Sequence, residues 1–408
     1  MRLLFLADDP PAFQKPTVKP KAKRLSDYAR RNFLFQKRLA RAFAERGNEV
    51  LFVTAEPSGK PGPVRFSVDT EGDLLCLTLF LTEKTPFSAA VKASSVLSEN
   101  AAAIAGFFEP DAVISAGFYP VSIFAAEKIA RFSGAVLVSF VAAAPKKIGA
   151  LLSEKAATFV AFRHIKTKSA AVFGSYPRFS ADFSGRKAHP FLMPPQKPAS
   201  KPSEKAKELR ERIETLREGG TFVLTAAGPF GKGFSVKALL RAAGSFDKKT
   251  AILLSGTGSE KPAFERFIRE NGLTNVTFGG EILPEDLSFV LGASDAVFLS
   301  ENADFGGSLT ESDRFLAAFG SQRPILATVS AHAGLFRESK NAVFTAPDDA
   351  GGLLKGLETL RGFSDEHRTR LGEQGRIFAD RHDFFPFFEE FSSFLLQLVT
   401  HQKENVDL

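Results

Sequence analysis

The stretch TFVLTAAGPFGKGFSVKALLRAA, residues 221–243, decides the fold class. Residues 221–226 are apolar apart from two threonines, which is typical of a strand buried on both faces. A glycine-rich turn follows, and residues 235–243 have the apolar spacing of a helix. A buried strand, a glycine-rich turn and a helix form the repeating unit of a doubly wound α/β sheet.

The same alternation continues toward the C-terminus. We predict strands at 250–255, 275–278, 296–299, 324–328 and 342–345, with helices at 261–271, 284–291 and 308–319. Most of these strands are short apolar runs, so both of their faces are expected to be covered by helices. Residues 205–383 are therefore predicted to form one Rossmann-like domain.

The N-terminal part shows the pattern again. We predict strands at 3–7, 50–54, 111–115, 135–141 and 157–162, with helices at about 25–46, at 121–132 and from about 166. Proline is frequent in residues 194–203, so we predict a domain at 1–190 and a linker at 191–204. The fold class is predicted to be α/β, with two doubly wound Rossmann-like domains facing a cleft that binds ligands at the strands' carboxyl ends.

Composition narrows the class of protein. The chain has 408 residues, 44% of them hydrophobic, and no apolar run long enough for a membrane span. We expect a cytoplasmic protein because no signal-peptide pattern is present, and the single cysteine and six histidines predict no metal site. Residues 1–50 hold 12 basic and 5 acidic residues. Their excess of seven positive charges equals the net charge of the whole chain, +7. This block favours an anionic partner, and a solvated surface is the alternative.

Three glycine-containing turns are candidate ligand sites. Lys232 stands between Gly231 and Gly233 before a helix, where its ammonium group and free backbone amides would neutralise a diphosphate; the alternative is a tight turn with an exposed lysine. Gly306-Gly307-Ser308 opens another predicted helix and is either a second anion site or an ordinary N-cap. Gly279-Gly280 would allow a flat base to approach the backbone, or else serves a turn with positive φ.

The order of these motifs resembles the GT-B glycosyltransferases of group 1, the GT4-like family. The resemblance spans nearly the whole chain, and its five motifs are LTAAGPFGKG (224–233), LSGTG (254–258), VTFGG (276–280), ASDAVFLSENADFG (293–306) and PILAT (324–328). It implies a retaining hexosyltransferase that takes a UDP- or GDP-linked sugar without a metal ion. It implies catalytic roles for Lys232 and Glu311 and assigns donor binding to Gly228, Gly231, Gly233, Gly256, Gly279, Gly280, Asp304, Gly306, Gly307 and Ser308.

The family's two glutamates do not map onto this chain in a single register. Counting from Ser300 places the first on Ala303, beside Asp304, and the second on Glu311. Counting back from Pro324 places the second on Ala317 instead. We favour Glu311 because it lies in the first predicted turn after Gly306-Gly307-Ser308, where its carboxylate could accept ribose hydroxyls; compensation of the helix dipole is the alternative.

Other family positions are changed. Pro229 follows Gly228 where the family has a diphosphate-binding arginine nearby, Ser115-Ala116-Gly117 replaces its first-domain histidine, and Pro10-Pro11 stands in place of its N-terminal glycine pair. Arg30 or Arg31 could supply the positive charge on the acceptor or phosphate side. The resemblance therefore leaves a non-catalytic GT-B scaffold that binds a nucleotide, glycan or protein as the second hypothesis.

The expected function is sugar transfer from a nucleotide sugar to a glycan or lipid-linked acceptor, in cell-surface polysaccharide or lipopolysaccharide synthesis. An anionic membrane surface is a further candidate partner, whereas nucleic acid is not expected because the aromatic residues are 43 Phe with 3 Tyr and no Trp. Residues 384–408 are predicted to form a final helix with Phe387, Phe391, Phe394 and Leu398 on one stripe. The resemblance implies that this helix crosses back to the first domain, which we favour over a membrane-surface helix.

Overall fold

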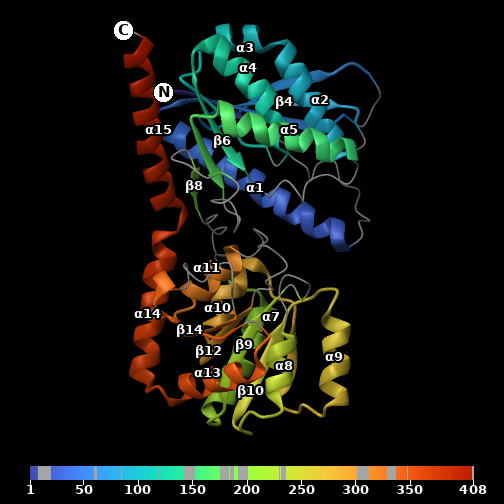
Figure 1. Cartoon of the computed structure of the whole chain (residues 1–408), viewed down its shortest axis with the longest axis vertical. Coiled ribbons are helices and arrows are strands. Elements are labelled where there is room, and N and C mark those ends of the chain that lie inside the picture. Colours follow the sequence, from blue (N-terminus) through green and yellow to red (C-terminus); the bar gives the residue numbers. More distant parts are fainter. Residues whose placement is uncertain are drawn as a thin grey trace. The chain divides into compact units, whose positions relative to one another are not determined.

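The computed structural model describes residues 1–7, 20–58, 62–83, 85–117, 119–141, 152–174, 183, 188–191, 201–228, 230, 236–300, 312–328, 337–346 and 348–406. The chain divides into two compact units, each built on one sheet (Figure 1). Unit 1 comprises Met1–Leu192 and Phe385–Leu408, and unit 2 comprises Met193–Phe384. The described residues include no helix with the length and apolar character needed to cross a membrane.

Unit 1 contains an eight-stranded sheet with the order β3-β4-β2-β1-β5-β6-β7-β8. Its strands are β1 (Arg2–Leu6), β2 (Glu49–Pro57), β3 (Arg65–Glu71), β4 (Leu74–Leu81), β5 (Ala112–Ser115), β6 (Val136–Val141), β7 (Ala171–Gly174) and β8 (Ala188–Pro190). All neighbouring pairs are parallel except β3 with β4, which form an antiparallel hairpin. The order reverses between β1 and β5, as in a doubly wound sheet.

The helices of unit 1 form two groups. They are α1 (Pro20–Glu45), α2 (Pro86–Glu99), α3 (Ala101–Phe108), the short η2 (Pro120–Ser122), α4 (Ile123–Ser133), α5 (Leu152–Lys168) and α15 (Phe384–Val406). Helices α2, α3 and α5 each contact α4, whereas α1 contacts α15 through Phe43 and Phe388, whose ring centroids lie 4.9 Å apart. Both groups bury apolar side chains against the sheet, which explains why its central strands are mostly apolar, with Ser115 and Ser139 as buried exceptions.

The strand predicted at 157–162 is wrong, because these residues lie inside α5. The run Ala-Ala-Thr-Phe-Val-Ala-Phe is apolar without a polar face, so its pattern does not separate a buried strand from a helix. In the structure Thr158, Ala161, Phe162 and Ile165 are buried at helical spacing, whereas the Phe159 side chain is 70% exposed. The helix therefore presents an apolar side chain to solvent.

Helix α15 packs on unit 1 along a wide aromatic face. The predicted stripe is only partly correct: Phe391 is buried, but the other fully buried side chains of the helix are Phe384, Phe388, Leu395 and Val399. Phe387 and Phe394 are partly buried beside this line, with ring centroids 5.5 Å from Phe35 and 4.5 Å from His189, respectively. The helix thus contributes to the core of unit 1, which disagrees with the membrane-surface alternative for this face.

An ion pair fixes the last turns of α15. Lys403 Nζ donates to Asp111 Oδ1 at 2.6 Å, and the backbone N–H of Arg2 donates to Asp111 Oδ2 at 2.7 Å. Burial alone would raise the pKa of Asp111, but these hydrogen bonds outweigh burial and lower it. The Asp111 carboxylate therefore stays charged and connects the first strand to the last helix.

Unit 2 contains a six-stranded, wholly parallel sheet with the order β11-β10-β9-β12-β13-β14. The strands are β9 (Phe222–Ala227), β10 (Thr250–Ser255), β11 (Val276–Gly280), β12 (Ala296–Ser300), β13 (Ile325–Thr328) and β14 (Ala342–Phe344). The helices are α7 (Glu204–Glu218), α8 (Lys237–Ala243), α9 (Lys261–Glu270), η4 (Pro284–Asp286), α10 (Leu287–Leu291), α11 (Ser312–Gly320), α13 (Ala350–Gly362) and α14 (Asp365–Arg381). The strand order reverses between β9 and β12.

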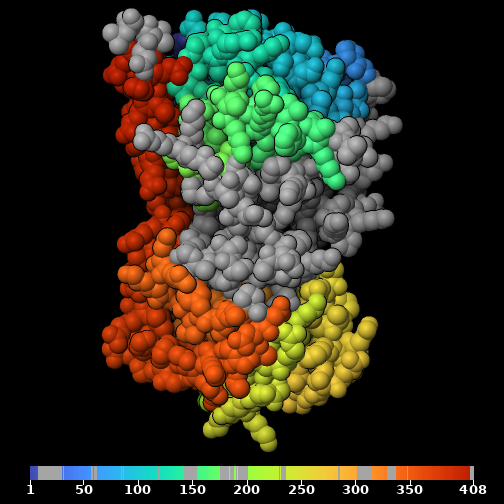
Figure 2. Space-filling model, viewed as in Figure 1, coloured from blue at the N-terminus to red at the C-terminus, as the bar shows by residue number. Residues whose placement is uncertain are grey.

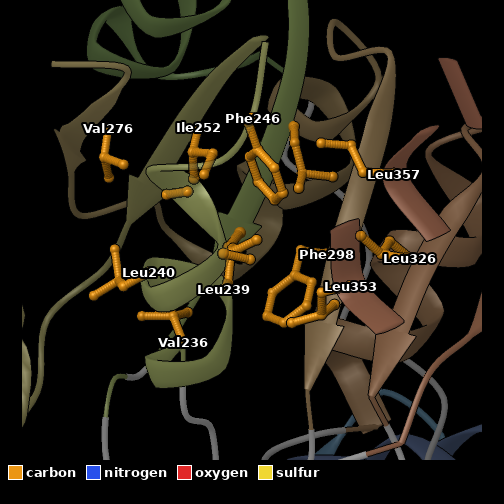
Figure 3. Close-up of a cluster of buried hydrophobic side chains, with 14 of the residues drawn as sticks. Val236, Leu239, Leu240, Phe246, Ile252, Val276, Phe298, Leu326, Leu353 and Leu357 are labelled. Atoms are coloured by element: carbon orange, nitrogen blue, oxygen red, sulfur yellow. The ribbon is translucent and has the colours of Figure 1, made fainter. Parts of the chain in front are cut away.

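The core of unit 2 covers both faces of this sheet because successive strand residues point to opposite sides. Phe222, Leu224 and Ala226 of β9 belong to one cluster with residues of α8, α9 and α13, whereas Val223 packs in a second cluster with α7 and α10. In Figure 3, Leu239 of α8, Phe298 of β12 and Leu353 of α13 point into the first cluster. The sheet is therefore held rigidly, which fixes the places where its loops begin.

Candidate functional site

The candidate site of unit 2 lies where the parallel strands end, beside the reversal between β9 and β12. In open α/β sheets the crevice at such a switch point is the usual place for a ligand. The loop after β9 contains Lys232, and the loop after β12 contains Glu311. Because β9 and β12 are paired and parallel, both loops leave the same edge of the sheet.

The loops after β9 and β10 are joined by their backbones. Gly228 N–H donates to Ser255 O at 2.8 Å, and Phe230 N–H donates to Thr257 O at 2.8 Å. A Cβ on Gly256 would lie 2.7 Å from Gly228 O, and a Cβ on Gly258 would lie 2.0 Å from Phe230 O. Glycine at 256 and 258 is therefore required for the close approach of these two loops.

Buried side chains flank the part of the sequence that contains Lys232. Phe230 and Val236 are both fully buried, and the Phe230 ring lies 5.8 Å from that of Phe264 and 6.1 Å from that of Phe278, centroid to centroid. The predicted donor residues Gly231, Lys232 and Gly233 lie between these two anchors but outside the described residues. The loop that contains Lys232 therefore begins and ends at buried positions, Phe230 and Val236.

The two predicted base-binding glycines have structural roles. Gly280 has φ of +82°, so it needs the conformational freedom of glycine, as the turn alternative predicts. A Cβ on Gly279 would lie 2.6 Å from Ser255 Oγ and 2.7 Å from Leu209 Cδ1, which makes this position too close-packed for another residue. The contacts with Ser255 and Leu209 therefore explain Gly279 without a ligand, although both glycines still present bare backbone at the site edge.

A cation that the sequence pattern does not predict lies at this edge. A Cβ built on Gly280 would lie 3.1 Å from Lys205 Nζ, so this side chain of α7 extends over the glycine turn. Helix α7 is positioned by Ser203, whose hydroxyl donates to the buried carboxylate of Asp286 at 2.6 Å. No local motif identifies Lys205, because the helix is brought to β11 by tertiary packing.

The loop after β12 contains the remaining predicted site residues. Asp304, Gly306, Gly307, Ser308 and Glu311 all lie outside the described residues. The structure does place the flanks of the loop: Ser300 ends β12 and is buried, and α11 begins at Ser312. Within the described ranges, no group of three or more His, Cys, Asp or Glu side chains could hold a metal ion.

Unit 1 has a comparable edge at its own strand-order reversal. Asn32 of α1 donates from Nδ2 to Ala116 O at 3.2 Å, directly after β5, and Ser115 Oγ lies 2.9 Å from Ser122 Oγ. The predicted acceptor-side residue Arg30 is exposed two positions before Asn32, so it lies near this edge. The backbone of Arg31 is also in α1, but its side chain is outside the described part of the chain.

Two Rossmann-like units, each with its strand order reversed beside the first strand of its sheet, constitute the GT-B fold of glycosyltransferases. The predicted α/β class with two doubly wound Rossmann-like domains is therefore confirmed.

Solved structures of three proteins show this similarity. Sucrose-phosphate synthase from Thermosynechococcus elongatus matches with a TM-score of 0.63 and 13% identity, over 98% of this chain and 99% of that one. Anabaena Alr3699/HepE, solved with UDP and glucose, matches with a TM-score of 0.60 and 14% identity, over 97% and 100%. WaaG, a glycosyltransferase involved in lipopolysaccharide biosynthesis, matches with a TM-score of 0.55 and 16% identity, over 97% and 99%.

No family model and no curated protein sequence matches this chain. At 13 to 16% identity, the three likenesses establish the fold and leave the activity to be argued from the site.

Proposed function

We propose that this protein is a glycosyltransferase that moves a sugar from a UDP- or GDP-linked donor to a glycan or lipid-linked acceptor. The observation that carries the proposal is the edge of unit 2 at the β9–β12 reversal. There, the loops after β9 and β10 are hydrogen-bonded and closely packed at their glycines, and Lys205 extends over Gly280. The loop that contains Lys232 begins and ends at buried residues, Phe230 and Val236. The proposal is supported by the GT-B fold, because the Anabaena protein of similar fold was solved in complex with UDP and glucose.

In this proposal the transfer breaks the bond between the sugar's anomeric carbon and the diphosphate oxygen. The acceptor oxygen forms the new glycosidic bond, and the acceptor proton and the nucleoside diphosphate are released. Lys232 and the backbone amides of Gly231, Gly233 and Gly306–Ser308 would stabilise the negative charge that develops on the leaving diphosphate. These groups supply the charge that a metal ion would otherwise provide, so the proposal includes none.

The remaining residues have positioning roles in the proposal. The base would lie against Gly279 and Gly280, the ribose hydroxyls on Glu311, and the donor sugar near Asp304. Arg30 and Arg31 would attract a phosphorylated or lipid-linked acceptor. Retention of the anomeric configuration and a role in cell-surface polysaccharide or lipopolysaccharide synthesis are further parts of this proposal.

Calorimetric titration with UDP, GDP, ADP and CMP tests the donor site. One nucleotide is expected to bind, and Lys232→Ala should weaken its binding about 10- to 100-fold because a charge-assisted contact to phosphate is lost. The matched control is Lys355→Ala, which removes an exposed lysine from α13 and should leave affinity unchanged. Failure of all four nucleotides to bind wild type, or equal binding by Lys232→Ala, would contradict the proposed site.

A non-catalytic scaffold is the second candidate, and it is favoured by Pro229 and by Ser115-Ala116-Gly117 at positions where the family carries reactive or charged side chains. The enzyme is expected to transfer the sugar and release nucleoside diphosphate, whereas the scaffold is expected only to bind. With the bound nucleotide identified, its sugar conjugates and a panel of glycan and lipid-linked acceptors are incubated with protein. Release of nucleoside diphosphate that Lys232→Ala abolishes supports the enzyme, whereas binding without release supports the scaffold.

We also propose that α5 brings unit 1 to an anionic membrane surface. Phe159 is 70% and Val160 is 46% exposed, and the exposed basic side chains on this helix are Lys155, Arg163, Lys166 and Lys168. The helix has one carboxylate, Glu154 in its first turn, and Lys168 pairs with Glu127 of α4 at 3.5 Å, so Lys155, Arg163 and Lys166 carry most of the charge of this surface. Figure 2 shows the green side chains of α5 at the surface. Exposed aromatic and basic side chains together suit the headgroup region of an anionic bilayer.

Co-sedimentation with phosphatidylglycerol and phosphatidylcholine vesicles tests this contact. Phe159→Ser combined with Arg163→Glu should lower binding to the anionic vesicles about 10-fold or more, because both an inserted ring and a favourable charge are lost. Phe107→Ser is the control, since Phe107 is 85% exposed on α3 but has no basic side chain on its own helix. Equal sedimentation of the double variant and wild type would disprove the proposal.

A further inference from the structure

Strand β3 forms an open edge of the sheet in unit 1. It pairs only with β4 among the described strands, and it lies outside β4, which Figure 1 labels. Its outward backbone N–H and C=O groups therefore have no partner strand in the part of the chain that the structure describes. Two apolar side chains are exposed on one face of this strand, Phe66 at 73% and Val68 at 57%. A second strand could pair here by continuing the sheet.

The sequence of β3 is complementary to itself when a second copy runs antiparallel. We propose that two copies of this protein associate through β3 with Ser67 on the two-fold axis. In this register Arg65 faces Asp69 of the second copy, and Phe66 faces Val68 of the second copy. Each pair occurs twice, so the contact joins two opposite-charge pairs and two apolar pairs on opposite faces of the extended sheet.

This register is favoured over the two neighbouring symmetric ones. Opposed residues must lie on the same face of the joined sheet, so the axis passes through a residue, and the alternative centres are Phe66 and Val68. A centre at Phe66 would place Arg65 opposite Ser67 and leave Asp69 without an opposite charge. The centre at Val68 is disfavoured by Glu71. That alternative places Arg65 opposite Glu71, which is already bonded to Lys37 at 2.5 Å and Arg41 at 2.8 Å. Arg65 and Asp69, in contrast, form no ion pair with the described residues, so both charges are available to a second copy.

The association is expected to be reversible and dependent on concentration. One pair of seven-residue strands buries less than the roughly 800 Å² per partner that is typical of stable complexes. The exposed charges of β3 also disfavour pairing with unrelated strands. An antiparallel copy of β3 places an opposite charge against each of Arg65 and Asp69, which an unrelated strand does not generally do. The contact thus selects a second copy of this chain over other partners.

Disulfide trapping tests the register directly. Opposed residues in an antiparallel pair have Cα atoms about 4.5 to 5.5 Å apart, within the range of a disulfide, so Ser67→Cys should form a covalent dimer under mild oxidation. Val68→Cys is the matched control, because in this register Val68 faces Phe66 and not its own copy. The native Cys76 is buried and should not cross-link. No faster trapping of Ser67→Cys than of Val68→Cys would overturn the proposal.

Charge exchange provides a second test that does not use cysteine. Sedimentation equilibrium of the full chain should show a monomer–dimer mixture. Arg65→Asp or Asp69→Arg alone should each weaken dimerisation about 10-fold or more, because like charges then face each other twice. The double variant Arg65→Asp/Asp69→Arg should recover the wild-type dimer fraction, since both pairs are restored with their signs exchanged. A wild-type chain that stays monomeric at the highest soluble concentration, or a double variant no better than the single ones, would disprove the contact.

Discussion

Gly258→Ala should destabilise the protein by about 4 kcal/mol, measured from the urea unfolding transition that contains unit 2. The added Cβ would lie 2.0 Å from Phe230 O, so the loops after β9 and β10 would have to separate. In addition, Gly258 has φ of +151°, which an alanine rarely adopts. The steric overlap and the backbone strain act together because both must be relieved by moving the same loop.

Gly272→Ala is the control for this variant. Gly272 also has positive φ, +59°, but a Cβ there would meet nothing within 4 Å. The free energy of unfolding of Gly272→Ala should fall by about 1 kcal/mol, which measures the cost of placing alanine at positive φ without a steric overlap. Equal losses for the two variants would contradict the close approach of Gly258 to Phe230 O. A Gly258→Ala protein that stays folded in dilute urea should also bind nucleotide less well, since Phe230 begins the Lys232 loop.

Phe391→Ala should lower the free energy of unfolding of unit 1 by about 3 to 5 kcal/mol. The Phe391 side chain is only 1% exposed, and its ring centroid lies 5.0 Å from Phe173, 5.3 Å from Phe140 and 5.9 Å from Phe43. These rings come from β7, β6 and α1, so the substitution leaves a cavity where four elements meet. The rigid strands on one side of this cavity cannot move in to fill it.

Leu396→Ala on the same helix is the comparison for Phe391→Ala. The Leu396 side chain is 53% exposed, so its loss should change the free energy of unfolding by less than about 0.5 kcal/mol. Thermal or urea unfolding of both variants, followed by near-ultraviolet circular dichroism, separates the two outcomes. A small effect at Phe391 would mean that α15 does not pack as closely on unit 1 as the ring distances indicate.

The central strands were predictable because a buried parallel strand is a short, uninterrupted apolar run. The predicted strand at 250–255 coincides with β10, and the one at 296–299 is extended by one residue in β12. Strand β3 was missed because it is largely exposed and mixes polar with apolar residues. Strand β4 was missed although it is a mostly apolar run, Leu74–Leu81. Helix α5 was mistaken for a strand since Phe159 and Val160 are apolar but face solvent.

Only those parts of the candidate site that depend on the order and spacing of motifs along the chain could be predicted from the sequence. The motif spacing gave the glycine turns at Gly228, Gly256 and Gly280, and the structure brings these three backbones into contact. The motif spacing could not predict Lys205, because this side chain reaches Gly280 only when α7 packs against the sheet. Nor could it show that Gly279 accommodates the side chain of Leu209, because local sequence does not encode which helix packs on a strand end.

The return of α15 to unit 1 has a consequence for biosynthesis. Unit 1 is discontinuous in sequence: Phe385–Leu408 emerges from the ribosome after all of unit 2. Until then Phe43, Phe140 and Phe173 lack the helix that covers them, so the nascent chain carries an exposed phenylalanine-rich surface throughout the synthesis of unit 2. Domains generally fold as they are made, and exposed apolar surfaces of this kind are what chaperones bind. The first unit to begin folding is thus the last to be completed.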